Sequence, residues 1–142
     1  VFEPTASEYQ AEGKWYIVAS VGEASGDIPY TSFIALESYI NNNPDTIKGF
    51  LRALKKAHDF IKNNTEYVVA ENIVKQFPGT TINSIETSIK SYKSINAWDT
   101  DLIPEESSFN RLQDVMDNAG ELSNRIDFKD ITDFRIANEV FS

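Results

Sequence analysis

The 142-residue chain contains no cysteine and a single histidine, His58. Without cysteine it cannot form disulfides, use a thiol nucleophile or bind zinc through thiolates. One histidine would have to serve every role in a Ser-His-Asp arrangement, and a transition-metal site would need carboxylates alone. We therefore expect no catalytic residue, no metal site and no cofactor in this chain, and we expect His58 to be structural or partly exposed.

Basic residues and long apolar runs are also scarce. The chain has 13 lysines and arginines against 22 acidic residues, which gives a formal charge of −9. This charge argues against a nucleic-acid partner, because phosphate binding needs a basic surface. No apolar run approaches the ~20 residues of a membrane-spanning helix. The remaining composition, 41% hydrophobic and 25% charged, is typical of one globular domain.

Two segments before residue 40 have the composition of β-strands. Trp15–Val21 and Tyr30–Leu36 are rich in aromatic and β-branched residues, and the turn-prone sequence GEASGDIP separates them. The rest of the chain has the periodicity of helices, so we predict an α/β, mostly helical fold with two strands and five or six helices. Because two strands do not make a stable sheet alone, we expect their neighbouring strands to lie outside this chain.

The clearest predicted helix follows Asn43 as its N-cap, has Pro44 at its first position and is expected to be the longest element. Basic residues occupy one side of it, and an apolar stripe recurs at three- and four-residue spacing on the other: Ile47, Phe50, Leu51, Leu54, Ala57 and Ile61. Two further helices are predicted from Thr65 to about Phe77 and over Ser84–Ile95, the latter with Asn83 and Glu86 as a capping pair. Another is predicted after Pro104, with a stop at Gly120. The last is predicted from Asp127 to Phe141, with a break near Asp133.

Two short segments carry groups that suit a small ligand. At Glu3-Pro4-Thr5-Ala6-Ser7 a predicted strand end meets a helix start, whose free N–H groups can bind a carboxylate, sulfonate or phosphate. Pro29-Tyr30-Thr31-Ser32 places an aromatic ring and two hydroxyls where the chain enters a predicted strand. Trp98 is either a core residue or an exposed aromatic wall. For each of these places an ordinary structural role is the alternative.

The order of these features resembles the carboxyl-terminal half of substrate-binding proteins of ABC importers. The shared pattern is a strand ending in FEP, a short helix, a strand, then PYTSFIA, an Asn-Pro-acid helix start and FLRALKKAHDFI. The segments INAWDTDLIPEESSFNRLQDVMDNAGEL and DFKDITDFRIANEVF are similar to that family's tail. The branch that it resembles is the nitrate, sulfonate, taurine and thiamine-precursor group, which includes NMT1/THI5-like proteins.

The resemblance implies a two-lobed fold of the periplasmic-binding-protein-like type II, with the ligand held between the lobes and only the second half present here. Residues 1–29 would form the end of the second lobe and the hinge crossover, and residues 30–142 the carboxyl-terminal part of the first lobe. The residues placed at the cleft by the resemblance would bind ligand: Glu3, Pro4, Thr5, Pro29, Tyr30, Thr31, Ser32 and Trp98.

The function implied is that of the extracytoplasmic solute-binding component of an importer, either periplasmic or lipid-anchored on a Gram-positive cell surface. Its partners would be a small-molecule ligand in the full-length protein and an ABC permease, and it would not be an enzyme. The alternatives are an enzyme of thiamine-pyrimidine biosynthesis on the same scaffold and a helical interaction module. As a fragment, the chain is expected to bind no small ligand tightly and to form a homo-oligomer through exposed strand edges.

Overall fold

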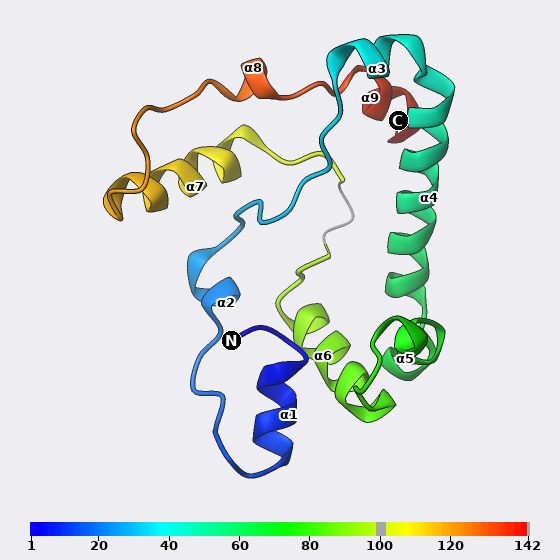
Figure 1. Cartoon of the computed structure of the whole chain (residues 1–142), viewed down its shortest axis with the longest axis vertical. Coiled ribbons are helices and arrows are strands. Elements are labelled where there is room, and N and C mark those ends of the chain that lie inside the picture. Colours follow the sequence, from blue (N-terminus) through cyan, green and yellow to red (C-terminus); the bar gives the residue numbers. More distant parts are fainter. Residues whose placement is uncertain (99–101, 142) are drawn as a thin grey trace. The chain divides into compact units, whose positions relative to one another are not determined.

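The computed structural model describes residues 1–98 and 102–141, and every regular element within them is a helix (Figure 1). The elements in chain order are α1 (Thr5–Ala11), α2 (Val21–Ser25), α3 (Glu37–Asn42), α4 (Pro44–Asn63), α5 (Glu66–Ile73), the 3₁₀ helix η1 (Val74–Gln76), α6 (Ile82–Ser94), α7 (Glu106–Asn118), α8 (Phe128–Ile131) and α9 (Arg135–Phe141). The predicted α/β fold class with two strands is therefore wrong for the described part of the chain.

The two predicted strands lie in segments without regular structure. Residues 15–20 and 30–36 form no strand, and Val21 opens α2 instead. Their apolar side chains are largely in solvent, with Tyr16 82% and Ile34 93% exposed. A strand is stabilised by hydrogen bonds and side-chain pairs with a neighbouring strand, and none is present among the described residues. The β-propensity of these segments is consequently not realised, because it describes side chains that fit a half-buried sheet surface.

The described residues form two compact units, and α4 contributes residues to both. Unit 1 comprises residues 1–25 together with residues from 57 to 98 and contains α1, α2, the end of α4, α5, η1 and α6. Unit 2 comprises residues 26–56 together with residues from 102 to 141 and contains α3, most of α4, α7, α8 and α9. The assignment of residues 1–29 and 30–142 to two lobes of a larger fold remains a prediction.

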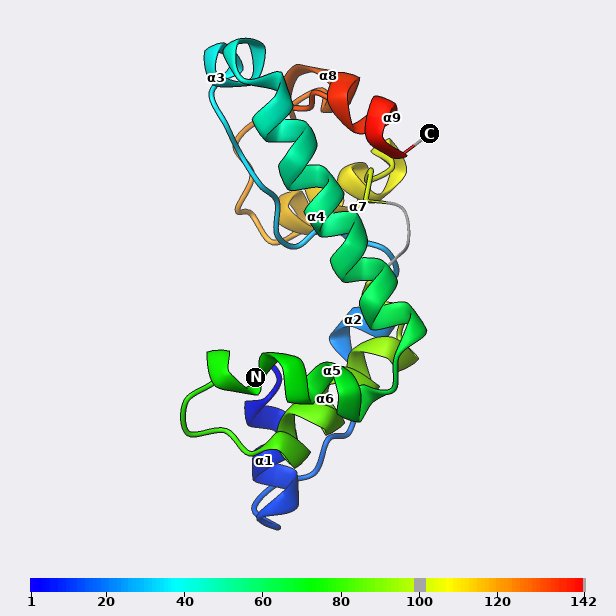
Figure 2. The same cartoon turned by 90° about the vertical axis from the view of Figure 1, so that its right-hand side faces the viewer.

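Unit 1 has its core between α5 and α6, which lie side by side (Figure 2). Val69 and Ala70 of α5 meet Ile85 and Ile89 of α6, and all four side chains are at most 3% exposed. The surrounding apolar residues that are partly buried against this cluster are Ile61, Ile73, Val74, Ile82 and Trp98. The apolar residues of α6 that recur at three- and four-residue spacing, Ile82, Ile85 and Ile89, thus form or border the core.

Unit 2 is held by an aromatic row and by hydrogen bonds across a loop. The ring of Phe128 lies 5.5 Å from that of Phe109 and 5.6 Å from that of Phe134, so α8 connects α7 to the start of α9. Gln113 of α7 is buried, and its amide accepts the N–H of Ile126 at 2.8 Å and donates to the same residue's carbonyl at 3.2 Å. These two bonds fix the loop between α7 and α8 by a single side chain.

The helix ends confirm some sequence predictions and correct others. At 20 residues α4 is the longest element among the described helices, as predicted, and the tail breaks between α8 and α9 around Asp133, also as predicted. The predicted capping pair of α6 is wrong: the helix begins at Ile82, and Thr81 Oγ1 accepts the N–H of Ser84 at 3.1 Å. Asn43 donates its side-chain amide to the Tyr39 carbonyl at the end of α3 at 3.0 Å. Asn43 stands directly before the first residue of α4, as predicted, and its backbone carbonyl accepts the N–H of Ile47 at 3.2 Å. The side-chain hydrogen bond observed for it in the described residues is the one to α3.

Among the helices described, none has both the length and the hydrophobicity needed to cross a lipid bilayer.

Candidate functional site

Glu3 closes the amino end of α1 with its own carboxylate. Oε2 accepts the backbone N–H of Ser7 at 3.0 Å and lies 3.5 Å from the Ser88 hydroxyl of α6. Pro4 and Thr5 are half-buried at the same helix start. An anionic ligand placed here would meet a carboxylate that already accepts a helix N–H group. The predicted ligand contacts at Glu3, Pro4 and Thr5 remain predictions, and the observed contacts give Glu3 a structural role.

The second predicted segment, Pro29 to Ser32, lies in unit 2 and has no regular structure. Pro29 is half-buried, whereas Tyr30 is 78% exposed. Arg111 of α7 covers the turn that precedes Pro29, and its Nη1 donates to the Asp27 carbonyl at 3.3 Å. Gly26 has a φ of +67°, in the left-handed region that favours glycine. A Cβ there would lie 2.5 Å from Arg111 Nη1, so the arginine side chain would have to move.

Trp98 belongs to unit 1, where its ring makes an edge contact with Tyr92 at 5.4 Å and packs against the α5–α6 core. The sequence left a core role and an exposed wall open, and the packing favours the core. Glu3 and Trp98 both contact residues of α6, namely Ser88 and Tyr92. The segment from Pro29 to Ser32 belongs to the other unit, so within each unit the structure assembles only part of the predicted set.

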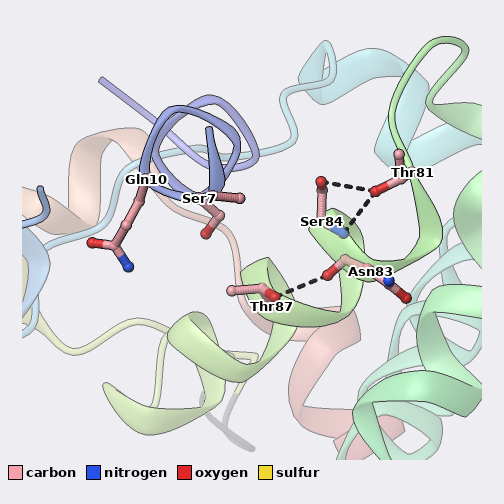
Figure 3. Close-up of a pocket in the computed structure, with 7 residues that line it drawn as sticks. Ser7, Gln10, Thr81, Asn83, Ser84 and Thr87 are labelled. Atoms are coloured by element: carbon pink, nitrogen blue, oxygen red, sulfur yellow. Dashed lines mark hydrogen bonds between the residues drawn. The ribbon is translucent and has the colours of Figure 1, made fainter. Parts of the chain in front are cut away.

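An open pocket of about 490 Å³ lies between α1 and the amino end of α6 in unit 1 (Figure 3). Its walls carry hydroxyl and amide groups and no charged side chain: Ser7, Gln10 and Ala11 come from α1, and Thr81, Asn83, Ser84 and Thr87 from α6 and its cap. Ser7 belongs to the segment that was predicted as a ligand site from the sequence, whereas the wall residues from α6 and its cap were not predicted. The two parts of the wall are about seventy residues apart, and no local motif links them.

Most polar groups of the pocket wall already have partners within the fold. Thr81 Oγ1 lies 2.9 Å from Ser84 Oγ, Thr87 donates to the Asn83 carbonyl at 2.9 Å, and Gln10 Oε1 accepts the N–H of Ile17 at 2.9 Å. Ser7 is different: it is 5% exposed, and its hydroxyl makes no hydrogen bond in the described part of the chain. The pocket can therefore offer a small polar molecule a neutral wall with one unused hydroxyl beneath it.

The carboxyl groups with shifted pKa values are not pocket wall residues. Hydrogen bonds from the Arg135 side chain and backbone lower the pKa of Asp133 in unit 2. A hydrogen bond from its own backbone N–H, followed by the charge of Lys93, lowers the pKa of Glu66 at the start of α5. The described residues contain no group of three or more histidine or acidic side chains arranged to hold a metal ion.

Comparison with known proteins relates the chain to a curated protein. No protein-family model matches the chain, and no solved structure matches it significantly. The chain is 37% identical over 142 residues to a curated Bacillus subtilis (strain 168) protein named "Putative binding protein YtlA". The alignment covers 100% of this chain and 42% of that relative, so the chain spans less than half of the relative's length. The relative's name describes a binding role and specifies no ligand.

Proposed function

We propose that this chain belongs to a solute-binding protein that captures a small polar molecule outside the cytoplasm and delivers it to an ABC importer. The observation that carries this proposal is the 37% identity, along the whole chain, to a protein named for binding. Because the chain corresponds to 42% of that relative, the proposal concerns the complete gene product that contains the chain. The family resemblance of the FEP, PYTSFIA and FLRALKKAHDFI segments supports the importer class.

The chemistry of the described residues suits binding without a covalent step. Capture of a solute requires a cleft with hydrogen-bonding groups and a closing motion, but no nucleophile or general base. The pocket wall in unit 1 supplies neutral hydroxyl and amide groups, and Tyr30 in unit 2 supplies an exposed aromatic ring. Neither place has a charged cluster that would favour proton transfer.

Among the solutes of the resembled family, we propose a thiamine pyrimidine or zwitterionic taurine in preference to nitrate. The carboxylate of Glu3 accepts the Ser7 N–H group at the start of α1. A purely anionic solute would be repelled by this carboxylate at short range. A neutral heterocycle avoids this repulsion. Independently of Glu3, the exposed ring of Tyr30 in unit 2 is suited to stacking on a heterocycle.

Calorimetric titration of the complete gene product tests the proposal. The panel is taurine, ethanesulfonate, nitrate and 4-amino-5-hydroxymethyl-2-methylpyrimidine. We expect one of these solutes to bind at micromolar or tighter Kd, with the pyrimidine or taurine ahead of nitrate. Absence of heat and of competition for all four would contradict the solute class, and a preference for nitrate would contradict the argument from Glu3.

A pair of matched tyrosine variants tests the predicted ligand segment. Tyr30 and Tyr16 are 78% and 82% exposed, and both lie in segments without regular structure. We expect Tyr30→Ala to weaken binding of the pyrimidine about fivefold or more, through loss of a stacking contact of about 1–3 kcal/mol. Tyr16→Ala should change binding less than twofold. Equal effects of the two substitutions would remove Tyr30 from the ligand site.

The proposed location is the outer side of the cytoplasmic membrane, with an ABC permease as the partner. Protease treatment of intact cells, or of spheroplasts for a periplasmic protein, should degrade the protein while a cytoplasmic marker survives. Co-purification with the permease from detergent extracts should increase when the solute is present. Full protection from the protease would contradict the location, and it would favour the alternative of a biosynthetic enzyme.

We also propose that the isolated 142-residue chain associates with a second copy of itself. Residues 15–20 and 30–36 contain no charged side chain, and Val18 and Ile34 within them are 94% and 93% exposed. Exposed apolar segments that have no neighbouring strand can pair with an equivalent segment of another molecule. Light scattering should give the mass of a dimer or larger, and Val18→Lys with Ile34→Lys should shift it toward the monomer. A monomer at all concentrations would contradict self-association.

A further inference from the structure

Helix α4 gathers positive charge in an acidic chain. It carries five of the 13 basic residues and two of the 22 acidic ones, so its formal charge is +3 where that of the whole chain is −9. Four of these cations form what we call the basic face: Arg52, Lys55, Lys56 and Lys62. At 100° per residue they fall within an arc of about 120°, and they extend about 15 Å along the helix.

The basic face is turned to solvent and is not neutralised by the fold. All four cations are exposed, whereas Ile47, Leu51 and Leu54 on the opposite stripe are half-buried. A fifth cation, Lys48, pairs with Glu139 of α9 at 2.5 Å. The four residues of the basic face make no ion pair within the described part of the chain. Asp59 lies on the same face and reduces its charge.

We propose that the basic face of α4 is a docking surface for an anionic phospholipid membrane, on which the protein lies with α4 toward the headgroups. A straight row of exposed cations on an amphipathic helix matches a flat anionic surface in charge and in shape. Three of the four residues are lysines, which act as point charges for headgroups. An acidic protein partner would favour arginine, because protein interfaces are enriched in arginine and depleted of lysine.

The charge of the remaining chain weakens this binding. The chain outside α4 has a formal charge of −12, because the whole chain carries −9 and α4 carries +3, so it is repelled by the same surface. Each cation near an anionic leaflet raises the membrane partition coefficient about fivefold. This attraction acts within about one Debye length of the surface. The binding is therefore expected to be weak, reversible and abolished by salt.

Sedimentation with vesicles tests the proposal, using the full chain in 50 mM and 500 mM NaCl. We expect binding to vesicles of phosphatidylglycerol and phosphatidylcholine at equal parts, none to pure phosphatidylcholine, and loss of binding at the higher salt. The double substitution Lys55→Gln with Lys56→Gln should lower partitioning about 25-fold. Lys75→Gln with Lys90→Gln removes the same charge from exposed positions elsewhere, and it should lower partitioning less than threefold.

Asp59→Asn provides a variant that gains binding. The substitution removes the negative charge from the basic face, and only the backbone carbonyl of Asp59 is used by its neighbour Asn63. Partitioning should rise about fivefold, while circular dichroism shows unchanged helix content. Equal losses for the two lysine pairs, or binding that survives 500 mM NaCl, would overturn the proposal. So would the absence of binding to the phosphatidylglycerol vesicles by both wild type and Asp59→Asn.

Discussion

Ser88 and Glu3 are 85 positions apart in the sequence, yet the Ser88 hydroxyl lies 3.5 Å from Glu3 Oε2. The same oxygen accepts the N–H of Ser7 at 3.0 Å, and Ser88 also donates to the Ser84 carbonyl at 2.8 Å. One carboxylate thus closes the first turn of α1 and connects it to α6. The open pocket lies between these two helices, so its shape depends on this contact.

Glu3→Ala is predicted to destabilise unit 1 by about 1 kcal/mol, because the Ser7 N–H and the Ser88 hydroxyl lose their shared acceptor. Urea denaturation followed by circular dichroism measures the change. Glu121→Ala, at an exposed position after α7, serves as the control and should change stability by less than about 0.5 kcal/mol. Equal changes in unfolding free energy for the two variants would mean that the Glu3 carboxylate does not stabilise α1.

Ile85→Ala is predicted to cost about 2–5 kcal/mol, since Ile85 is 3% exposed in the core between α5 and α6. Ile34→Ala removes the same atoms from a side chain that is 93% exposed, and it should cost less than about 0.5 kcal/mol. Thermal and urea unfolding compare the two. A small effect of Ile85→Ala would contradict the packing of α5 on α6.

Asn43→Asp distinguishes two roles of Asn43. If the side chain capped α4, aspartate would replace it without loss, because both residues are good N-caps. In the structure the Asn43 amide donates to the Tyr39 carbonyl, and a carboxylate cannot donate there. We therefore expect Asn43→Asp and Asn43→Ala to destabilise alike, by about 1 kcal/mol. Stability retained by the aspartate variant alone would restore the capping role.

The stability contributed by Asp133 is predicted to depend on pH. Hydrogen bonds from Arg135 lower the pKa of the Asp133 carboxyl from its ordinary value of 3.8. A lowered folded-state pKa means that the ionised carboxylate stabilises the fold above the unfolded pKa of about 3.9, and that this stabilisation is lost as the pH falls through the folded value. The difference in unfolding free energy between wild type and Asp133→Asn should be constant from pH 7 to about 5 and shrink below about pH 4. A constant difference down to pH 2 would contradict the pairing.

Helical periodicity was the part of the fold that the sequence predicted well. The apolar stripe from Ile47 to Ile61 identified α4, and Gly120, with a φ of +74°, follows α7 as a helix stop. The strands were wrong because strand formation depends on a neighbour that local composition does not reveal. A local signal for α2 was present: in Ser20-Val21-Gly22-Glu23 the serine hydroxyl accepts the Glu23 N–H at 3.2 Å, as an S-x-x-E pattern predicts.

The candidate site was less accessible to sequence reasoning. The pocket needs Ser7 of α1 beside Thr87 of α6, and this proximity comes from packing rather than from a motif. Glu3 was identified from the sequence as a residue near a helix start, but its carboxylate proves to accept the Ser7 N–H itself. Arg111, which covers the turn before Pro29, had no sequence signal, because its contact with Asp27 spans 84 positions.

Recovery of the bound solute distinguishes binding without chemistry from catalysis. The complete gene product is dialysed to equilibrium against taurine and against 4-amino-5-hydroxymethyl-2-methylpyrimidine, and the protein chamber is then denatured and examined by proton NMR. The account predicts that one solute accumulates with the protein at one equivalent and is recovered chemically unchanged after prolonged incubation. Accumulation of neither solute, or recovery of a chemically altered product, would contradict it.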